Sequence, residues 1–309
     1  MAFAVAAKAA VEESGGRSAR AIRLALVQSR SEVGTESYDP RDDNMARAIE
    51  SIDRAASDEA NVVVFGELYL SGYRTDEWLH RWATTIDPPD GHIRALLERA
   101  DRHRITILMG MATFGATMPG DVYNSTAVVC PGGLAGVYRK SHVAAFPYNN
   151  GAAVEVSMER CFYSPGKELP VFDTPAGQIG VHICYDMSFP EVARVQTLKG
   201  ADILINTSGS AGGFEEYWDH VAWTRAVENL TWYAVCSVVG VQRGTVLFGG
   251  SRVIDPGGTV VAAAKHNVED YIVCDVDLER ARHVRATSHT LSIRQPGLYA
   301  SIAEPTHAI

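Results

Sequence analysis

The sequence has no long hydrophobic run and no excess of positive charge, and both absences exclude classes of partner. Its apolar runs, such as residues 232–241, fall well short of the roughly 20 residues that span a bilayer. Lys and Arg number 28 against 37 Asp and Glu, which gives a formal net charge of -9. Because no overall basic field is present to hold a phosphate backbone, we expect neither nucleic acid nor a membrane as a partner.

Cysteine is scarce and widely spaced. The chain contains no CxxC pair and no short His/Cys cluster of the kind that binds zinc. Its five cysteines are Cys130, Cys161, Cys184, Cys236 and Cys274. An odd number at such spacings favours reduced thiols and therefore a cytoplasmic location over a disulfide framework. No metal site is predicted.

Nucleotide-binding signatures are absent as well. The sequence has no GxGxxG motif at a strand-to-helix turn and no GxxxxGK(S/T) motif, so dinucleotide-binding and P-loop folds lose their main support. The chain has 309 residues, of which 46% are hydrophobic, and we expect a single domain over residues 21–309. The start lacks the cationic end and long apolar centre of a secretory signal, so residues 1–20 are interpreted as a flexible N-terminal extension.

Short apolar runs alternate with longer amphipathic stretches, a rhythm typical of α/β proteins. The first half predicts strands at residues 22–28, 62–65, 105–112, 122–130 and 134–138, and helices at 42–57 and 91–103. The second half predicts strands near Val171 and at 179–183, 203–206, 233–239, 251–254, 259–263 and 271–276, and helices after Pro190 and at 215–230. This repetition predicts a four-layer α-β-β-α sandwich of two packed mixed sheets, although a doubly wound single sheet fits the same pattern. The Gly/Pro-rich segment 147–166 interrupts the rhythm and is expected to be a functional loop.

One cysteine stands out by its position. In residues 180–191, GVHICYDMSFPE, an apolar strand runs into Cys184 and a helix is expected just beyond. Backbone dipoles at such a helix start should lower the thiol pKa and offer N–H groups to a developing oxyanion. Cys184 is therefore the best candidate nucleophile among the five, although buried cysteines are most often inert core residues.

Two other predicted strands end in charged groups. Glu67 follows the apolar strand 62–65, and Lys140 follows the strand 134–138. A thiol that attacks an amide needs a group to take its proton and another to stabilise the oxyanion, and these two side chains could supply both. The alternative is that Glu67 and Lys140 form a structural ion pair.

Together, these three segments resemble the nitrilase superfamily of carbon-nitrogen hydrolases. In that family, a Glu after the first core strand, a Lys in a Tyr-Arg-Lys-x-His segment and a Cys in a Cys-Tyr/Trp-Asp-x-x-Phe-Pro-Glu segment form the catalytic triad. The order, spacing and flanking residues agree here. The likeness runs from about residue 22 to residue 276 and includes the segments Gly72-Tyr73, Tyr123-Asn124-Ser125, 162–166, 200–202, 225–229 and 251–258.

The resemblance implies a role for each residue. Glu67 would be the general base that deprotonates Cys184 and later activates water, and Lys140 and the backbone N–H of Tyr185 would hold the oxyanion. A second glutamate usually lies shortly before a Phe/Tyr-x-x-Pro-Gly-like stretch. Glu159 fits this place, and Glu155 is the alternative.

The implied reaction is acyl transfer through a thioester, with release of ammonia or an amine and without a metal or organic cofactor. In the resembled family, the glycine-rich segment after residue 206 lines the substrate pocket, which points to Ser208 and Gly209 as substrate-binding residues together with Tyr73; an ordinary strand-to-helix loop is the alternative reading of that segment. Family members usually pair across a helix-containing face, so a homodimer or a higher homo-oligomer is expected.

The residues around Cys184 bear on the substrate. Met187 and Ser188 replace the arginines of N-carbamoyl-D-amino acid hydrolases, and Ser188 also replaces the arginine usual in omega-amidase-like members. Tyr185 and Asp186 depart from the Cys-Trp-Glu segment of true nitrilases. What remains is an amidase acting on a small neutral or cationic amide, with an N-carbamoylputrescine-type amidohydrolase as the alternative and a nitrilase as a weaker one. A catalytically silent binding protein of the same fold would have no need of all three triad residues.

Two histidines could in principle activate the cysteine. His182 shares a strand face with Cys184 at about 7 Å, too far for a direct hydrogen bond, and is expected to be a core residue. His142 is expected to brace the loop that carries Lys140.

Overall fold

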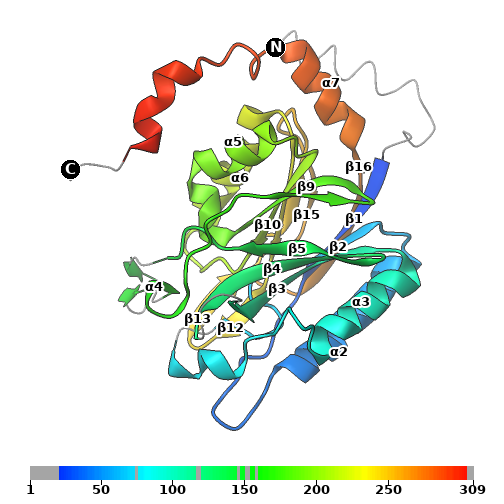
Figure 1. Ribbon diagram of the computed structural model, residues 1–309, viewed down its shortest axis with the longest axis vertical. Helices are drawn as coiled ribbons and strands as arrows, with labels where there is room; N and C mark the ends of the chain where they lie inside the picture. Colours follow the sequence, from blue (N-terminus) through cyan, green and yellow to red (C-terminus); the bar gives the residue numbers. More distant parts are fainter. Residues whose placement is uncertain are drawn as a thin grey trace.

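The computed structural model describes residues 21–73, 76–115, 120–144, 147–149, 154–156 and 159–304 (Figure 1). The extension expected at residues 1–20 lies outside them. Among the described residues, the strands form two six-stranded mixed sheets and two short hairpins.

The first sheet has the strand order β16-β1-β2-β3-β4-β5. Strands β1 to β3 run parallel, whereas β16, β4 and β5 are antiparallel to their neighbours. Helices α2 and α3 lie along one face of this sheet (Figure 1). The bounds are β1 (Ala21–Gln28), α2 (Arg41–Ser57), β2 (Val62–Phe65), α3 (Gly91–His103), β3 (Thr106–Phe114), β4 (Val122–Cys130), β5 (Gly133–Arg139) and β16 (Asp270–Asp277).

The second sheet has the order β15-β14-β11-β10-β9-β8. Its central strands β9, β10 and β11 are parallel, and β8, β14 and β15 are antiparallel additions. Helices α5 and α6 pack on one face of it. The bounds are β8 (Val171–Thr174), β9 (Gly177–Ile183), α5 (Pro190–Leu198), β10 (Ile203–Ser208), α6 (Glu215–Asn229), β11 (Trp232–Ser237), β14 (Arg252–Ile254) and β15 (Val260–Ala263).

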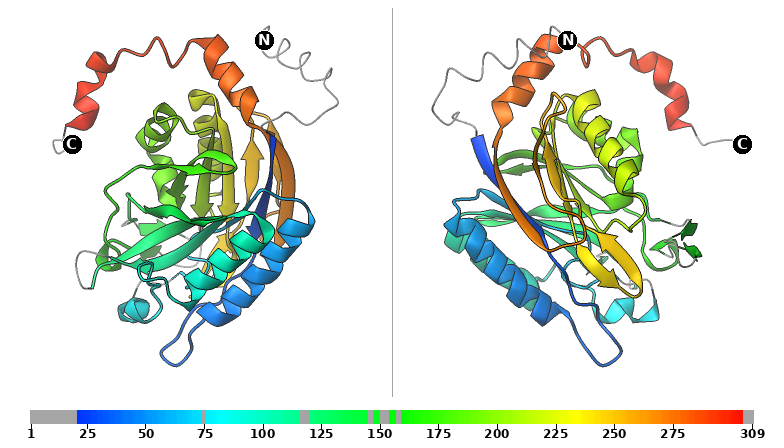
Figure 2. Two further views of the ribbon diagram at one scale, coloured as in Figure 1. Left: turned by 45° about the vertical axis from the view of Figure 1, so that its right-hand side comes forward. Right: turned by 180° about the vertical axis from the view of Figure 1, so that it is seen from behind.

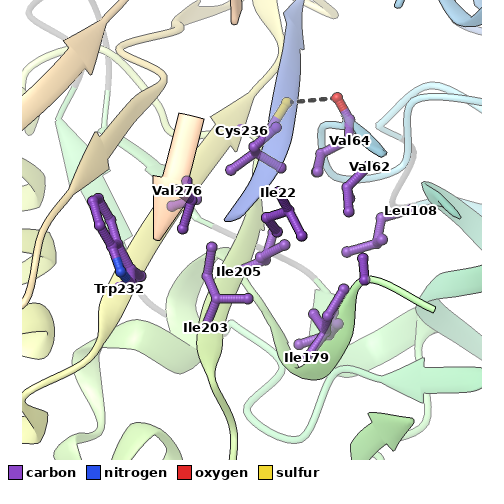
Figure 3. Close-up of a cluster of buried hydrophobic side chains, with 14 of the residues drawn as sticks. Ile22, Val62, Val64, Leu108, Ile179, Ile203, Ile205, Trp232, Cys236 and Val276 are labelled. Atoms are coloured by element: carbon purple, nitrogen blue, oxygen red, sulfur yellow. Dashed lines mark hydrogen bonds between the residues drawn. The ribbon is translucent and has the colours of Figure 1, made fainter. Parts of the chain in front are cut away.

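The core explains why the central strands are apolar at nearly every position. Successive side chains of a strand point to opposite faces, so Leu24 and Leu26 face the other sheet, whereas Ala25 and Val27 face α2 and α3. The side chains between the sheets form one continuous cluster (Figure 3), in which the Cys236 thiol donates to the Val64 carbonyl over 3.1 Å. This arrangement confirms the α-β-β-α sandwich and not the doubly wound single sheet.

Several elements were not predicted. They are the hairpins β6 (Pro147–Asn149) with β7 (Val154–Val156) and β12 (Val239–Gln242) with β13 (Thr245–Phe248), the 3-10 helix η1 (Glu77–Arg81), helix α7 (Leu278–Ser288) and the 3-10 helix η3 (Pro296–Ala303). Helix α7 buries only Leu278 and Ala281, and η3 buries nothing, so neither leaves a clear periodic pattern. Within the described ranges, no helix has the length and apolar content needed to cross a membrane.

Residues 289–304, here called the C-terminal arm, leave the body of the molecule after α7. Figure 2 shows the arm running outside the sandwich from α7 to η3 in both views. Its apolar side chains face solvent: Ile293 is 72% exposed, Leu298 is 73% exposed and Ile302 is 61% exposed.

Candidate active site

The carboxyl ends of strands from both sheets meet at one edge of the sandwich. Glu67 lies two residues beyond β2 and Lys140 directly follows β5, both in the first sheet. In the second sheet, Cys184 directly follows β9 and Ser208 ends β10. The Glu67 N–H donates to the Ser208 carbonyl over 3.0 Å, which joins the two sheets at this edge. Parallel strand ends are a common location for ligand sites in α/β folds.

The Lys140 ammonium lies between two carboxylates. Its Nζ is 2.7 Å from Glu67 Oε1 and 2.8 Å from Glu159 Oε2, and all three side chains are 0–1% exposed. Glu159 begins the short helix α4 (Glu159–Phe162), inside the segment that interrupts the strand-helix rhythm. The two predicted glutamates and the lysine thus form one buried cluster.

Burial and mutual charge shift the pKa values of this cluster in opposing ways. Burial raises the Glu67 pKa, Lys140 opposes the rise and Glu159 adds to it. Burial by itself would lower the Lys140 pKa, but the charges of Glu159 and Glu67 raise it well above its ordinary value. Lys140 is therefore a cation at neutral pH, and it lies between two carboxyl groups.

Neutral groups complete the cluster. The Asn124 amide donates to Glu67 Oε1 over 2.7 Å and to Glu159 Oε1 over 3.3 Å. The Tyr73 hydroxyl and the Ala144 N–H also donate to Glu159, over 2.5 Å and 2.8 Å. Tyr73, predicted to bind substrate, is thus bonded to a catalytic candidate. Asn124 was given no role from sequence, although an amide inside an apolar strand is unusual enough to have drawn attention.

Cys184 sits on a strained turn. It starts the 3-10 helix η2 (Cys184–Ser188) with a φ of 43°, a left-handed conformation that is costly for a residue with a side chain. The Asn206 amide donates to the Cys184 carbonyl over 3.3 Å. The Ser208 hydroxyl and the Gly209 N–H lie close enough to the thiol to lower its pKa. Both residues predicted to line the pocket therefore contact the candidate nucleophile.

The expected low thiol pKa is wrong. Burial and the negative charge of Glu67 raise the Cys184 pKa to about 12, outweighing Lys140, the Gly209 N–H and the Ser208 hydroxyl. The dipole argument failed because η2 is a single short turn, whereas a buried carboxylate is a full charge. Cys184 is a neutral thiol at neutral pH and needs a base.

One oxygen of the Glu67 carboxylate is not used by the cluster. Glu67 Oε2 is buried and has no hydrogen-bond partner among the residues that the structure describes. It lies near Gly209, where a Cβ atom would come within 3.2 Å of it. Because the Gly209 N–H also lies close to the thiol, Oε2 and Cys184 share a neighbour. An unpaired buried acceptor is costly and is typical of a group kept ready for a proton.

The described contacts do not test two of the residues named from sequence. Tyr185 lies in η2, and no described contact assigns its backbone N–H to an oxyanion, so that role stays a prediction. The Glu155 side chain lies outside the described part of the chain. In the portion that is described, no cluster of three or more His, Cys, Asp or Glu side chains is arranged to hold a metal.

His182 behaves as a structural group. His182 is buried, and burial lowers its pKa to about 4, so it is neutral. Gln196 donates its amide to the Val181 carbonyl, so its Oε1 accepts from His182 Nδ1 over 2.9 Å, and Tyr233 donates to Nε2 over 2.7 Å. His182 is thus fully engaged away from Cys184.

Comparison with known proteins agrees with this geometry. The family model described as carbon-nitrogen hydrolase matches residues 23–286. A probable nitrilase of Schizosaccharomyces pombe is 31% identical over 79% of this chain and 86% of its own length. The omega-amidase NIT2 of Homo sapiens is 30% identical over 90% of this chain and 96% of its own.

The fold agrees as well. The crystal structure of Saccharomyces cerevisiae Nit3, a member of branch 10 of the nitrilase superfamily, superimposes with a TM-score of 0.74 at 27% identity. The match covers 86% of this chain and 94% of the Nit3 chain. The residues that the family model matches include both sheets and the cluster of Glu67, Lys140 and Glu159. This chain therefore belongs to the carbon-nitrogen hydrolase family.

Proposed function

We propose that this protein hydrolyses the non-peptide C–N bond of a small amide through a thioester on Cys184. The observation that supports this best is the buried Glu67, Lys140 and Glu159 cluster beside a neutral thiol. A purely structural ion pair would need one carboxylate for one ammonium and no adjoining cysteine on a strained turn.

The chemistry follows from the protonation states. Glu67 Oε2 accepts the thiol proton as Sγ attacks the amide carbonyl, and the Lys140 ammonium and the Tyr185 N–H stabilise the oxyanion. The proton then passes from Glu67 to the leaving nitrogen, and ammonia departs as the C–N bond breaks. Glu67 next deprotonates a water that attacks the thioester, which releases the acid and returns the proton to Cys184. Glu159 holds Lys140 in place throughout.

The substrate is proposed to be neutral or cationic. Ser188, which stands in place of an arginine in the resembled amidases, accepts a hydrogen bond from the Tyr217 hydroxyl over 3.1 Å. The nearby Arg225 guanidinium is directed to the Met187 and Ser188 carbonyls and to Glu228. A substrate carboxylate would therefore find these groups already engaged.

A substrate panel tests this function. The purified protein would be given a neutral primary amide, an omega-amide that bears a carboxylate, an N-carbamoyl amine and a nitrile, with ammonia release as the measurement. We expect kcat/KM for the neutral amide to exceed that for the carboxylate-bearing amide by at least about tenfold, since an unpaired charge costs more than about 1.4 kcal/mol. Turnover of the nitrile alone would contradict the amidase assignment, and preference for the N-carbamoyl amine would replace it with the ureido reaction.

We also propose that the chain forms a homodimer through the C-terminal arm and the α5–α6 face. Apolar side chains are exposed on both: Leu198 ends α5, Tyr217 and Trp223 lie on α6, and the arm presents Leu298 and Ile302. Such patches on one chain are typical of interaction surfaces. A second copy would cover both at once.

The dimer is tested by charging the arm. In Leu298→Asp/Ile302→Asp, neither side chain is buried in the described fold, so folding should persist while association is lost. Light scattering should report a mass near 33.5 kDa for this variant and twice that for the wild type. Val268→Asp, at another exposed apolar position, is the matched control and should stay dimeric. Equal masses for all three proteins would refute the arm's role.

A further inference from the structure

A second buried carboxylate lies near the site, and the mechanism above does not use it. Asp186 is fully buried in η2 and is surrounded by hydrogen-bond donors. Its Oδ2 accepts from the Tyr138 hydroxyl over 2.7 Å and from the Ile183 N–H over 3.0 Å. Its Oδ1 accepts from the Ser141 hydroxyl over 2.9 Å and from the His142 N–H over 2.8 Å, and the His142 ring Nδ1 lies 3.0 Å away.

These donors come from two different sheets. Tyr138, Ser141 and His142 surround Lys140 in sequence, so they belong to the end of β5 and the loop after it. Ile183 is the residue before Cys184, at the end of β9. One carboxylate therefore ties the segment that carries the ammonium to the turn that carries the thiol. The His142 ring also stacks on Phe189, with the ring centroids 3.8 Å apart, which fixes the same junction from the other side of η2.

We propose that Asp186 is a positioning residue that fixes the position of the Lys140 ammonium with respect to the Cys184 thiol. This inference rests on the proposed amide hydrolysis, since it assigns Asp186 to the geometry of that site. We call Asp186 and the hydrogen bonds that it accepts the Asp186 clamp. The strained φ of Cys184 explains why such a clamp is needed, because a left-handed residue persists only where surrounding contacts hold it in that conformation. The bond from the Ile183 N–H to Asp186 fixes the backbone on the side where the strain begins.

The charge of Asp186 matters as well as its shape. A carboxylate is an acceptor at both oxygens, and here each oxygen receives at least two donors. An asparagine of the same size would turn one oxygen into an NH₂ donor that faces other donors. Whichever way the amide turned, one side of the clamp would open. The pKa of Asp186 is lowered, because these hydrogen bonds and Lys140 outweigh its burial, so the clamp is closed at neutral pH.

The experiment compares Asp186→Asn with Asp202→Asn. Asp202 is a matched control, because it is also buried and hydrogen-bonded, to Gln178 N and Arg282, but lies at the opposite end of β10 from the site. We expect Asp186→Asn to lower kcat about 100-fold with KM changed less than about threefold, as misplacement of catalytic groups by about 1 Å does. We expect alkylation of Cys184 by iodoacetamide, followed by peptide mass analysis, to slow about tenfold. Asp202→Asn should leave kcat and alkylation within about twofold of wild type.

A second pair of variants applies if Asp186→Asn does not fold. Tyr138→Phe removes one donor from the clamp, and Tyr233→Phe removes an equally buried hydroxyl that bonds His182 instead. Tyr138→Phe should lower kcat about tenfold, because the lost bond to a charged group is worth about 1.4 kcal/mol. Tyr233→Phe should lower kcat less than about threefold.

Two results would overturn the clamp. One is a folded Asp186→Asn or Tyr138→Phe protein with wild-type kcat and alkylation rate, and the other is an equal loss in the matched controls. If the wild type releases ammonia from no amide, the proposed function fails instead. In that case, the alkylation rates alone decide whether Asp186 positions the thiol.

Discussion

Cys184→Ala is expected to lower kcat/KM for amide hydrolysis by at least about 10⁴-fold, as the loss of a nucleophile does in other acyl-transfer enzymes. Cys236 cannot take its place, because its side chain is packed between the sheets and bonds the Val64 carbonyl. The fold should persist, since alanine keeps the Cβ atom and loses only the sulfur of a partly buried residue.

Ammonia release and thermal unfolding would be measured side by side. Cys161→Ala is the matched control, because Cys161 is exposed on α4 and should be dispensable for catalysis. Mass spectrometry of the wild type, quenched during turnover, should detect an acyl adduct on the peptide that contains Cys184. Full activity in a folded Cys184→Ala protein would remove the thioester mechanism altogether.

Lys140→Met is expected to abolish activity and also to destabilise the fold by about 3–5 kcal/mol, the usual result of removing one partner from a buried charge network. Methionine fills much of the same space but leaves Glu67 and Glu159 facing each other without a cation. Lys265→Met, at an exposed lysine, should change neither property.

The destabilisation should depend on pH in a defined direction. Without Lys140, the folded-state pKa of Glu67, which burial already raises above its ordinary value of 4.5, should rise further, because the attraction that opposed burial is gone. A group whose pKa is raised by folding contributes stability at low pH that is lost as the pH rises through the folded pKa. The stability deficit of Lys140→Met should therefore shrink on acidification from about pH 8 to about pH 5.

Chemical denaturation at the two pH values measures this deficit against wild type. Adding Glu67→Gln and Glu159→Gln to Lys140→Met should restore much of the stability without restoring activity. A single variant as stable as wild type at both pH values would show that the cluster is not a buried charge network.

Much of this arrangement could be predicted from sequence because it depends on strand ends. The apolar runs before Glu67 and Cys184 define where two buried strands stop, and the run before Lys140 defines the end of the edge strand β5; a charged or reactive group directly beyond such a strand has little value for packing. Helices with a clear apolar stripe were also predicted from sequence: α3, for example, has an Asp90 cap and buries Ile93, Leu96 and Ala100 at helical spacing, whereas α7 has no such stripe.

What could not be predicted depends on contacts between distant segments. The sign of the Cys184 pKa shift is decided by burial and by Glu67, 117 residues earlier in the chain, and not by the local turn. The bonds of Asn124 to both glutamates appear only when β4 lies beside them. The C-terminal arm has neither a buried stripe nor alternation, so its sequence indicates no packing partner within the chain.

The division of the proposed catalytic groups between two sheets affects how precisely they can be aligned. Glu67 and Lys140 follow strands of one sheet and Cys184 follows a strand of the other, and the spacing between the two sheets is set by a layer of aliphatic side chains such as Val62, Val64 and Ile205 (Figure 3). The reaction rate of this enzyme should therefore depend sensitively on how the side chains between the two sheets pack. Loss of one methylene from this layer would lower turnover, because it would change the alignment of Cys184 with Glu67 and Lys140. This effect would occur at a destabilisation too small to unfold either sheet.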